Sequence, residues 1–364
     1  MARSADRYQE RIKRAGIRQR DLADRLGVHE TTVSRWFNSN SMPDPIGVKL
    51  DQLLGEIESE LQPEYLINSD EYQKEITSER RPVSLASQLN ECVSDLEKRR
   101  KGTANKSETC WSTLDESWGN WIAPGRLIIV SGKTGEGKTS FAQQLSESLS
   151  IQKASLYFSL EMPAKDLSWR TISRFSGVQL QVLEDPSKLT KSNVLAIEEA
   201  YRSAANLNLN IVDWADDISE IVSIIERTYE SLKGSKAPLE SVFIDYIQLM
   251  KAPGDNRAYQ IGNITRELKK VAIKLGVTVV AVSQYNREYK RNDGQLPEIT
   301  DLKDSSQIAH DADLIIDINV PKHDPKDGYD SVNVRVLKSR DYKRQNKKLA
   351  VVRETMNFED IVSA

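Results

Sequence analysis

The chain has little of the residue types that stabilise small secreted or zinc-binding proteins. Its 364 residues include two cysteines, Cys92 and Cys110, which stand far apart without a CxxC partner. This spacing argues against a disulfide framework and predicts two unpaired thiols in a reducing cytosol. Three histidines, His29, His310 and His323, are scattered along the chain. They offer little from which to build a structural zinc site.

Long hydrophobic runs are also missing. The mean hydropathy is -0.54, and charged residues make up 29% of the chain. No apolar run approaches the ~18 residues that a membrane-spanning helix needs. The first sixteen residues, MARSADRYQERIKRAG, lack the apolar core of a secretory signal. We therefore expect a soluble protein of the cytoplasm with no membrane partner.

The net charge of -3 is small, but the charges are unevenly placed. Residues 1–40 carry 9 Lys and Arg against 5 Asp and Glu, and residues 321–350 carry 9 against 4. Between these basic regions, residues 41–80 carry 3 against 10. This pattern favours local contacts with phosphate groups over a generally basic protein. Each patch can equally be solvated surface.

The order of patterns along the chain predicts three segments. Residues 1–62 form a small all-α unit, and residues 63–108 form a polar linker with a helix near 85–100. Residues 109–364 alternate short β-rich runs with amphipathic stretches. This alternation predicts an α/β domain with a mostly parallel sheet covered on both faces.

The predicted strands of this α/β domain are short apolar runs. They cover residues 126–130, 154–160, 209–213, 241–245, 277–284 and 313–320, with a possible antiparallel extension at 331–338 and 348–355. A helical stripe over 259–276 stops at Gly276, a typical C-terminal residue of a helix.

The stretch SGKTGEGKTS, residues 131–140, carries the most specific local motif. It meets the pattern G-x-x-x-x-G-K-[ST] between a β-rich run and a helical run. Such a loop wraps backbone N–H groups round the phosphates of a nucleotide, and the next helix offers its N-terminus to the same anion. The predicted nucleotide-binding residues are Gly132, Lys133, Thr134, Gly135, Glu136, Gly137, Lys138, Thr139 and Ser140. Lys138 is expected on the β and γ phosphates of ATP, and Thr139 on Mg²⁺.

Three polar residues follow predicted strands and complete a hydrolytic site. Asp245 ends the run SVFID, where a carboxylate linked to Mg²⁺ belongs. Glu161 ends YFSLE and can align a water molecule with the γ-phosphate, although it can also simply face solvent. Gln284 ends VTVVAVSQ and can sense the γ-phosphate, although it can also be an ordinary polar strand end.

Four segments together resemble one family. They read FSLEM, VFIDYIQLM, VTVVAVSQYNR and ITDLKDSSQIAHDADLI. In this order they are similar to the motifs of DnaB-type replicative helicases, and the resemblance runs from about residue 83 to the C-terminus. It implies a RecA-like P-loop ATPase core that assembles as a ring, usually a hexamer, on single-stranded DNA in a bacterial cell.

The resemblance also implies roles for particular residues. Glu161 matches the family's catalytic glutamate, Asp245 its Mg²⁺-linked aspartate and Gln284 its coupling glutamine. Lys338 and Arg340 match the lysine and the arginine finger that reach the γ-phosphate held by the neighbouring subunit. A lone subunit is then expected to be a poor ATPase, because the charge that stabilises the transition state arrives from its neighbour.

The family's DNA contacts match the segment 301–307. Lys303, Asp304 and Ser306 take the positions that hold the backbone of the single strand in the ring. Contacts of this kind follow a strand without reading its bases. The helix near 85–100 matches the linker helix that packs on an adjacent subunit.

The N-terminal segment resembles a different motif, the helix-turn-helix of phage repressors, in place of the family's usual N-terminal domain. Leu22, Ala23, Leu26, Val28, Val33 and Trp36 fit its buried positions, with Gly27 at the turn. The second helix would present Thr31, Thr32, Ser34 and Arg35 to the major groove of duplex DNA. The alternative is a helical module for protein contacts or ring assembly, which Glu30 favours.

These patterns lead to one main interpretation and two alternatives. The main one is an ATP-dependent ring helicase that its N-terminal module delivers to a phage or plasmid origin, with a loader or primase as possible partners. The first alternative is a DNA-binding regulator that senses ATP. The second is a RecA-type recombination ATPase, which would form filaments.

Overall fold

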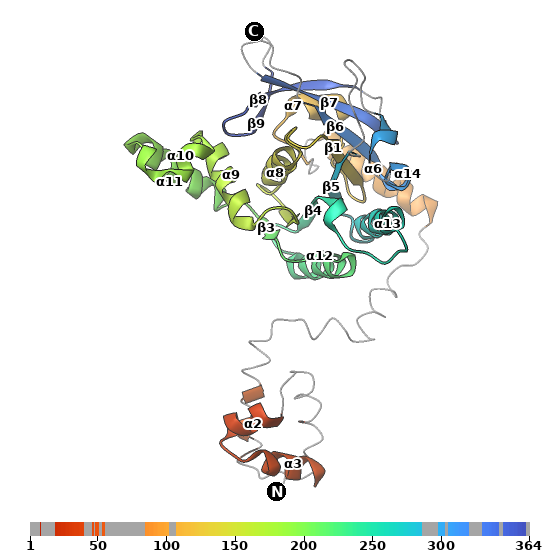
Figure 1. Cartoon of the computed structure of the whole chain (residues 1–364). Helices are drawn as coiled ribbons and strands as arrows, with labels where there is room; N and C mark the ends of the chain where they lie inside the picture. The colour runs from red at the N-terminus through yellow and green to blue at the C-terminus, as the bar shows by residue number, and fades with distance from the viewer. Residues whose placement is uncertain are drawn as a thin grey trace. The chain divides into compact units, whose positions relative to one another are not determined.

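A computed structural model gives the structure of Tyr8 and of residues 19–39, 46, 48–50, 53–54, 84–101, 107–285, 298–302, 305–319, 330–341 and 345–361. The chain divides into two compact units, Met1–Ala104 and Asn105–Ala364. Figure 1 shows the elements of both units.

Among the described residues, Asn105–Ala364 is built around a nine-stranded sheet of order β3-β2-β4-β5-β1-β6-β7-β8-β9. Strands β3, β2, β4, β5, β1 and β6 are parallel, and β7, β8 and β9 continue the sheet in antiparallel pairs. The strands are β1 Leu127–Gly132, β2 Ala154–Ser159, β3 Leu209–Val212, β4 Leu239–Asp245, β5 Thr278–Gln284, β6 Leu314–Asn319, β7 Asp330–Ser339, β8 Lys347–Val352 and β9 Asn357–Asp360. The predicted α/β fold with its mostly parallel sheet is confirmed.

Both faces of the parallel strands are buried, which explains why their sequences are continuous apolar runs. On β1, Leu127 and Ile129 belong to one hydrophobic core, and Ile128 and Val130 belong to the other. Helices α12, Ile218–Leu232, and α13, Arg257–Leu275, contribute to the first core. Helices α7, Ser112–Trp118, and α8, Lys138–Leu149, contribute to the second.

The predicted helix over 259–276 is α13, and local signals fix both of its ends. The Asn256 side chain accepts a hydrogen bond from the Tyr259 backbone at 3.0 Å, which caps the first turn. Gly276 follows the last turn with φ +67°, a conformation that glycine adopts without strain. Ile261, Ile264, Leu268 and Val271 of the predicted stripe are buried.

A group of shorter helices lies beside the β3 edge of the sheet (Figure 1). It consists of α9 Ala164–Ser176, α10 Leu180–Glu184 and α11 Lys191–Ala204. A buried ion pair joins this group to the sheet-covering helix α8, because Arg174 Nε of α9 lies 2.9 Å from Glu147 Oε2. The remaining described helices of this unit are the 3₁₀ turns Pro186–Lys188, Ile247–Leu249 and Ile299–Asp301 and the α-helix α14, Ser305–Asp311.

The unit Met1–Ala104 contains the helices α2 Gln19–Leu26, α3 Glu30–Asn38 and α6 Leu85–Arg100. Gly27 joins α2 to α3 with φ +72°. Of the predicted core positions, Leu22, Ala23, Leu26 and Val33 are buried, and Val28 and Trp36 are half-buried. The sequence interpretation omitted Tyr8, Phe37, Leu50 and Leu54, which complete this core.

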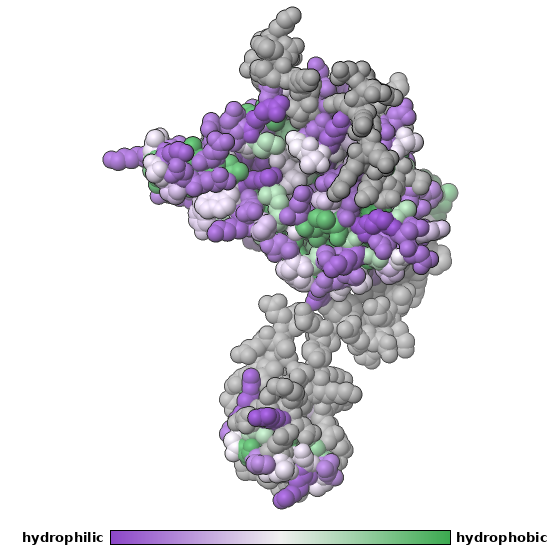
Figure 2. Space-filling model, viewed as in Figure 1, coloured by the Kyte–Doolittle hydropathy of each residue, from purple (hydrophilic) through white to green (hydrophobic). Residues whose placement is uncertain are grey.

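Polar residues cover most of the visible surface, with smaller hydrophobic patches between them (Figure 2). None of the helices that the structure describes combines the length and the hydrophobicity required to cross a membrane.

Candidate nucleotide site

The residues of the phosphate-loop motif join the end of β1 to the start of α8. Strand β1 ends at Gly132, and Lys138 is the first residue of the helix. Gly137 caps the helix with φ +82°. A Cβ built there would lie 2.9 Å from Phe358 Cζ, so only glycine allows this close approach. Strand, turn and helix therefore have the arrangement that holds a phosphate at a helix N-terminus.

The Lys138 side chain lies inside this loop. Only 6% of the residue is exposed, and its Nζ donates a hydrogen bond to the Lys133 carbonyl oxygen at 2.7 Å. Burial lowers the pKa of Lys138, while the nearby carboxylates of Asp245, Glu136 and Glu161 act in the opposite direction. The ammonium group is thus positioned where a bound phosphate would pair with it.

Asp245 ends β4 beside the loop and is almost fully buried. Tyr157 on the adjacent strand β2 donates a hydrogen bond to its Oδ2 at 3.1 Å. Burial raises the pKa of Asp245, and hydrogen bonding by Thr139 and Tyr157 lowers it in part. In the part of the chain that is described, Asp245 Oδ1 has no hydrogen-bond partner. A buried acceptor without a donor fits a position next to a bound cation.

The oxygen donors at this point suit Mg²⁺. Magnesium is commonly held by one or two carboxylate or hydroxyl oxygens together with substrate phosphates and water. The Thr139 hydroxyl and the Asp245 carboxylate supply such oxygens. The described residues contain no group of three or more His, Cys, Asp or Glu that could hold a metal by themselves. These residues fit a magnesium ion that arrives with a nucleotide.

Glu161 and Gln284 line the same cavity as the loop. The cavity has a volume of about 220 Å³. Its lining comprises Thr134, Gly135, Gly137, Lys138, Thr139, Ser140, Glu161, Met162, Arg170, Asp245, Tyr246, Gln284 and Met356. Glu161 follows β2 and is exposed. Gln284 ends β5 directly opposite Gly132 of the neighbouring strand β1. The structure therefore places together most of the residues that the sequence selects for the nucleotide, the metal and the water, while Gly132, Lys133 and Glu136 of the loop do not line the cavity.

Some residues around this cavity carry no local sequence signal. Met356 reaches it from the turn between β8 and β9 and has φ +51°. Gln248 accepts a hydrogen bond from the Gln284 backbone at 3.2 Å and donates one to Ser283 Oγ at 2.8 Å. Gln248 thereby holds the tip of β5 next to the loop. The proximity of Met356 and Gln248 to the loop depends on the tertiary fold.

A buried polar network lies behind the loop. The Tyr285 hydroxyl, next to Gln284 in sequence, donates a hydrogen bond to the fully buried Asp317 carboxylate. Asp317 stands opposite Ser131 in the sheet and lies 3.5 Å from an Arg335 nitrogen. Burial and the negative charge of Asp317 raise the pKa of Tyr285, so the hydroxyl remains a donor. This network connects the end of β5 to β6, the two strands that lie on either side of β1.

Lys338 and Arg340 do not join this cavity. The Arg340 backbone N–H donates to the Asp313 carbonyl oxygen, and the Asp313 backbone N–H donates to the Leu127 carbonyl oxygen. Arg340 is therefore level with Leu127, the first residue of β1, and Lys338, opposite Ile315 of β6, is level with Ile129. The phosphate loop follows the last residue of β1. At ~3.3 Å per residue, the two ends of this strand are roughly 17 Å apart.

The predicted DNA-contacting residues are only partly described. Lys303 and Asp304 lie outside the described residues, and Ser306 belongs to α14 without a described side chain. On α3, Thr31 and Arg35 are exposed, and Thr32 and Ser34 are half-buried. His29 accepts a hydrogen bond from the Thr31 backbone at 3.4 Å and caps α3.

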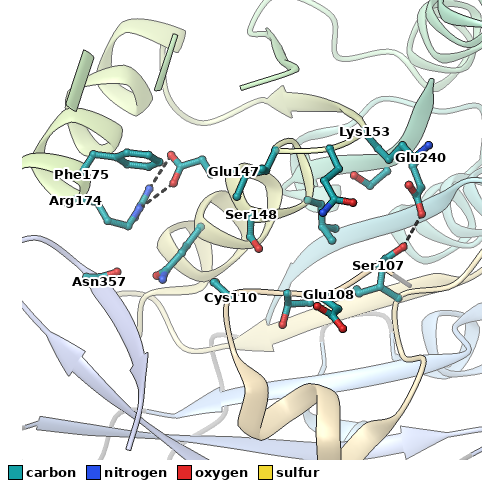
Figure 3. A pocket seen from close by; sticks show the side chains of 17 residues that line it. Ser107, Glu108, Cys110, Glu147, Ser148, Lys153, Arg174, Phe175, Glu240 and Asn357 are labelled. Atoms are coloured by element: carbon teal, nitrogen blue, oxygen red, sulfur yellow. Dashed lines mark hydrogen bonds and ion pairs between the residues drawn. The ribbon is translucent and has the colours of Figure 1, made fainter. Parts of the chain in front are cut away.

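A larger cavity of about 440 Å³ lies away from the phosphate loop (Figure 3). In it, Arg174 and Glu147 point toward each other, and Ser107 contacts Glu240 at 2.5 Å. Cys110 lines the same cavity as a free thiol.

Two family models match different parts of the chain. The family model described as "DnaB-like helicase C terminal domain" matches residues 106–360, and the model described as "Helix-turn-helix" matches residues 9–46. The "Replicative DNA helicase DnaB" of Pasteurella multocida is 33% identical over 254 residues, which cover 67% of this chain and 53% of that protein. A "Probable plasmid replicative DNA helicase" of Chlamydia muridarum is 29% identical over 63% of this chain and 52% of its own length.

Among solved structures, one described as an "ATPase Domain" superposes with a TM-score of 0.68 at 26% identity. It covers 78% of this chain and 100% of its own. The chain spans about half the length of the two relatives named above. Because the first family model matches more than half of the sequence, this chain belongs to the family of the DnaB-like helicase C-terminal domain.

Proposed function

We propose that the chain is an ATP-dependent DNA helicase whose subunits assemble into a ring around single-stranded DNA, a hexamer being the form that the family implies. The observation that carries the proposal is the separation of the catalytic groups within one subunit. Lys138, Asp245 and Glu161 lie at the carboxyl ends of the parallel strands. The side chains of Lys338 and Arg340 lie near the opposite ends of these strands. A complete site then requires two subunits.

In the proposed site, the side chains of one subunit hold and orient the reactants. Lys138 exchanges the Lys133 carbonyl for phosphate oxygens, and the backbone N–H groups of the loop bind the remaining phosphate charge. Glu161 orients a water molecule toward the γ-phosphate and accepts its proton. Thr139 and Asp245 would hold Mg²⁺, which would offset the negative charge of the phosphates when bound.

The neighbouring subunit supplies the remaining positive charge. Its Lys338 and Arg340 stabilise the charge that develops on the γ-phosphate in the transition state. Gln284 touches the same cavity from the tip of β5 and passes the loss of the γ-phosphate toward the DNA-contacting segment 301–307. Lys303, Asp304 and Ser306 of that segment hold the strand.

A forked DNA substrate tests the helicase proposal. The full chain with ATP and Mg²⁺ should displace the labelled strand, and Lys138→Ala should remove both strand displacement and ATP turnover. Lys153→Ala, which changes a lysine away from the phosphate loop, serves as the control. If the parent chain bound ATP but displaced no strand, the result would favour the alternative of an ATP-sensing regulator. Membership of the helicase family argues against that alternative. Filaments that pair DNA strands would favour the recombinase.

The N-terminal unit supports a second proposal, that the helicase is delivered to particular duplex DNA, such as a phage or plasmid origin. This proposal is supported by the match of residues 9–46 to a helix-turn-helix and by the exposure of Thr31 and Arg35 on α3. Footprinting of the full chain on DNA of its own replicon should reveal a protected site that Arg35→Ala weakens. Equal affinity for random duplex would refute delivery. We also propose a loader or a primase as a partner, and a pull-down with the full chain as bait tests this binding.

A further inference from the structure

A buried carboxylate holds the arginine that we assign to the neighbouring site. Asp313 precedes β6, and its side chain is 9% exposed. Its Oδ1 lies 3.1 Å from Arg340 Nη1, and its Oδ2 lies 2.6 Å from Lys269 Nζ. Oδ2 also accepts a hydrogen bond from the Leu127 backbone at 2.8 Å. Asp313 thus connects Arg340 to the first residue of the central strand β1.

The C-terminal end of α14 holds Arg340 and the nearby Lys338. Arg340 Nη2 donates a hydrogen bond to the His310 carbonyl oxygen at 2.7 Å. Lys338 Nζ donates to the carbonyl oxygens of Ala309 and Ala312, the second at 2.6 Å. The last carbonyl groups of a helix have no partner within the helix and carry partial negative charge, so they bind cations well.

The arrangement leaves part of Arg340 available to an anion. A guanidinium has five N–H donors in a rigid fork, and the contacts with Asp313 and His310 use one N–H group each of Nη1 and Nη2. The Arg340 side chain is 45% exposed. Burial and the charge of Arg340 lower the pKa of Lys338, while the carboxylates of Asp313 and Asp311 act in the opposite direction. The exposed part of the guanidinium can still receive an anion from outside.

We infer that Asp313 is a positioning residue for the arginine finger. With the carbonyl groups at the end of α14, it holds the Arg340 guanidinium in one orientation, with the free edge directed to the nucleotide of the neighbouring subunit. The inference rests on the proposed function and adds the group that aligns its finger. Since α14 begins at Ser305, within the segment 301–307, one short helix connects the finger to the segment proposed to bind DNA.

The test uses Asp313→Asn in the full chain. Asparagine keeps the shape of the side chain and an oxygen for the Leu127 N–H group but removes the charge that binds Arg340. We expect the DNA-stimulated kcat to fall by about ten- to a hundredfold, the effect of losing a charge-assisted hydrogen bond that orients a reacting group. KM for ATP should change little, because the subunit's own phosphate loop is intact. Asp341→Asn, next to Arg340 and paired with Arg126 at the surface, is the matched control and should keep kcat within about twofold.

Mixed assemblies separate a positioning role from a structural one. Asp313→Asn subunits carry an intact phosphate loop, and Glu161→Ala subunits carry an intact finger. Assemblies of both, purified through two different tags, should regain part of the turnover that each variant lacks. Arg340→Ala mixed with Glu161→Ala provides the reference for a site shared between subunits. If Asp313→Asn fails to fold, the double variant Asp313→Asn/Lys269→Met removes both buried charges and carries the same expectations.

Each other outcome overturns the inference. Near-normal kcat in Asp313→Asn would mean that Arg340 needs no alignment by this carboxylate. Suppose that Glu161→Ala subunits restore turnover when mixed with Arg340→Ala but not when mixed with Asp313→Asn. The defect of Asp313→Asn would then lie in the nucleotide site of its own subunit, and the proposed function would still stand. If neither mixture regained turnover while both variants were inactive, the shared site itself would be wrong.

Discussion

Lys138 and Asp245 are buried ionisable groups, and burial shifts their pKa values in opposite directions. The pKa of Lys138 is lowered and that of Asp245 is raised. Each shift means that the charged form is less stable here than in water. A nucleotide phosphate and a magnesium ion would supply the missing opposite charges. These buried charges are therefore expected to lower the free energy of unfolding of the free protein, and binding of nucleotide and magnesium is expected to raise it again.

We predict that Asp245→Asn stabilises the free protein while abolishing ATP turnover. Because the folded-state pKa of Asp245 is raised, the folded protein binds this proton more tightly than the unfolded chain. The contribution of Asp245 to stability is thus present below its ordinary pKa and is lost as the pH rises through the folded-state value. Thermal unfolding from pH 4 to 7 should show an advantage of Asp245→Asn that grows with pH to on the order of 1 kcal/mol. A variant less stable than the parent at pH 7 would contradict the assignment.

The glycines of the loop give a second prediction at this scale. Gly135 and Gly137 both have positive φ, but a Cβ meets nothing within 4 Å at Gly135 and meets Phe358 at 2.9 Å at Gly137. Gly135→Ala should cost ~1–2 kcal/mol of unfolding free energy from backbone strain alone. Gly137→Ala should cost ~1–3 kcal/mol more, because the aromatic ring must also move. Urea denaturation measures both, and equal losses would mean that the ring adapts freely.

The sequence predicts some residues of the site much better than others. Lys138, Thr139 and Asp245 follow from a motif and from their positions at strand ends, where the order of a parallel sheet places them together. Met356 lines the same cavity from a hairpin, and Gln248 supports its edge from a 3₁₀ turn. No short pattern marks them, because only the tertiary packing decides which distant turn covers the loop.

At the scale of elements, most of the sheet could be predicted because parallel strands buried on both faces are continuous apolar runs. Strand β9, Asn357–Asp360, was missed because it has four residues and only Phe358 is buried. Its pairing with β8 is defined by packing instead. Trp111 Nε1 donates to the Phe358 carbonyl oxygen at 3.0 Å, and Gln144 Nε2 donates to the same atom at 2.8 Å. The first contact joins β9 to the start of α7, and the second joins it to α8, the helix that begins at the phosphate loop.

The ion pair between α8 and α9 gives a prediction for these elements. The side chains of Arg174 and Glu147 are 4% and 3% exposed. In Arg174→Met, the Glu147 carboxylate keeps the donors Gln143 and Thr171 but loses its paired charge. This substitution should lower the free energy of unfolding by ~3–5 kcal/mol, because it leaves a buried charge without a partner. The double variant Glu147→Gln/Arg174→Met should recover most of this loss. Chemical denaturation of the parent and both variants provides the comparison, and a single variant within ~1 kcal/mol of the parent would refute a buried-charge penalty.

At the scale of the whole molecule, α6 carries an exposed apolar stripe. Leu85, Leu89, Val93 and Leu96 follow one another at helical spacing, and all are more than half exposed in the single chain. We propose that this stripe packs on a neighbouring subunit, as the resemblance implies. Among the described residues, none of α6 belongs to the two hydrophobic cores of Asn105–Ala364.

We predict that Leu89→Glu reduces the size of the assembly without unfolding the chain. A charge in an apolar interface costs free energy that no local contact offsets. Light scattering at several protein concentrations should show smaller particles. ATP turnover should fall in parallel, because the proposed site is shared between subunits. Ser94→Glu, on another side of α6, should change neither. Full-size assemblies of Leu89→Glu would exclude the stripe from the interface.

In the proposed assembly, each nucleotide is contacted by two subunits. Electron cryo-microscopy of the full chain with single-stranded DNA and a non-hydrolysable ATP analogue tests this claim most directly. We predict a closed ring with the strand in its centre, in which Arg340 of one subunit contacts the γ-phosphate held by Lys138 of the next. Nucleotides contacted by only one chain, with Arg340 still far from any phosphate, would contradict it.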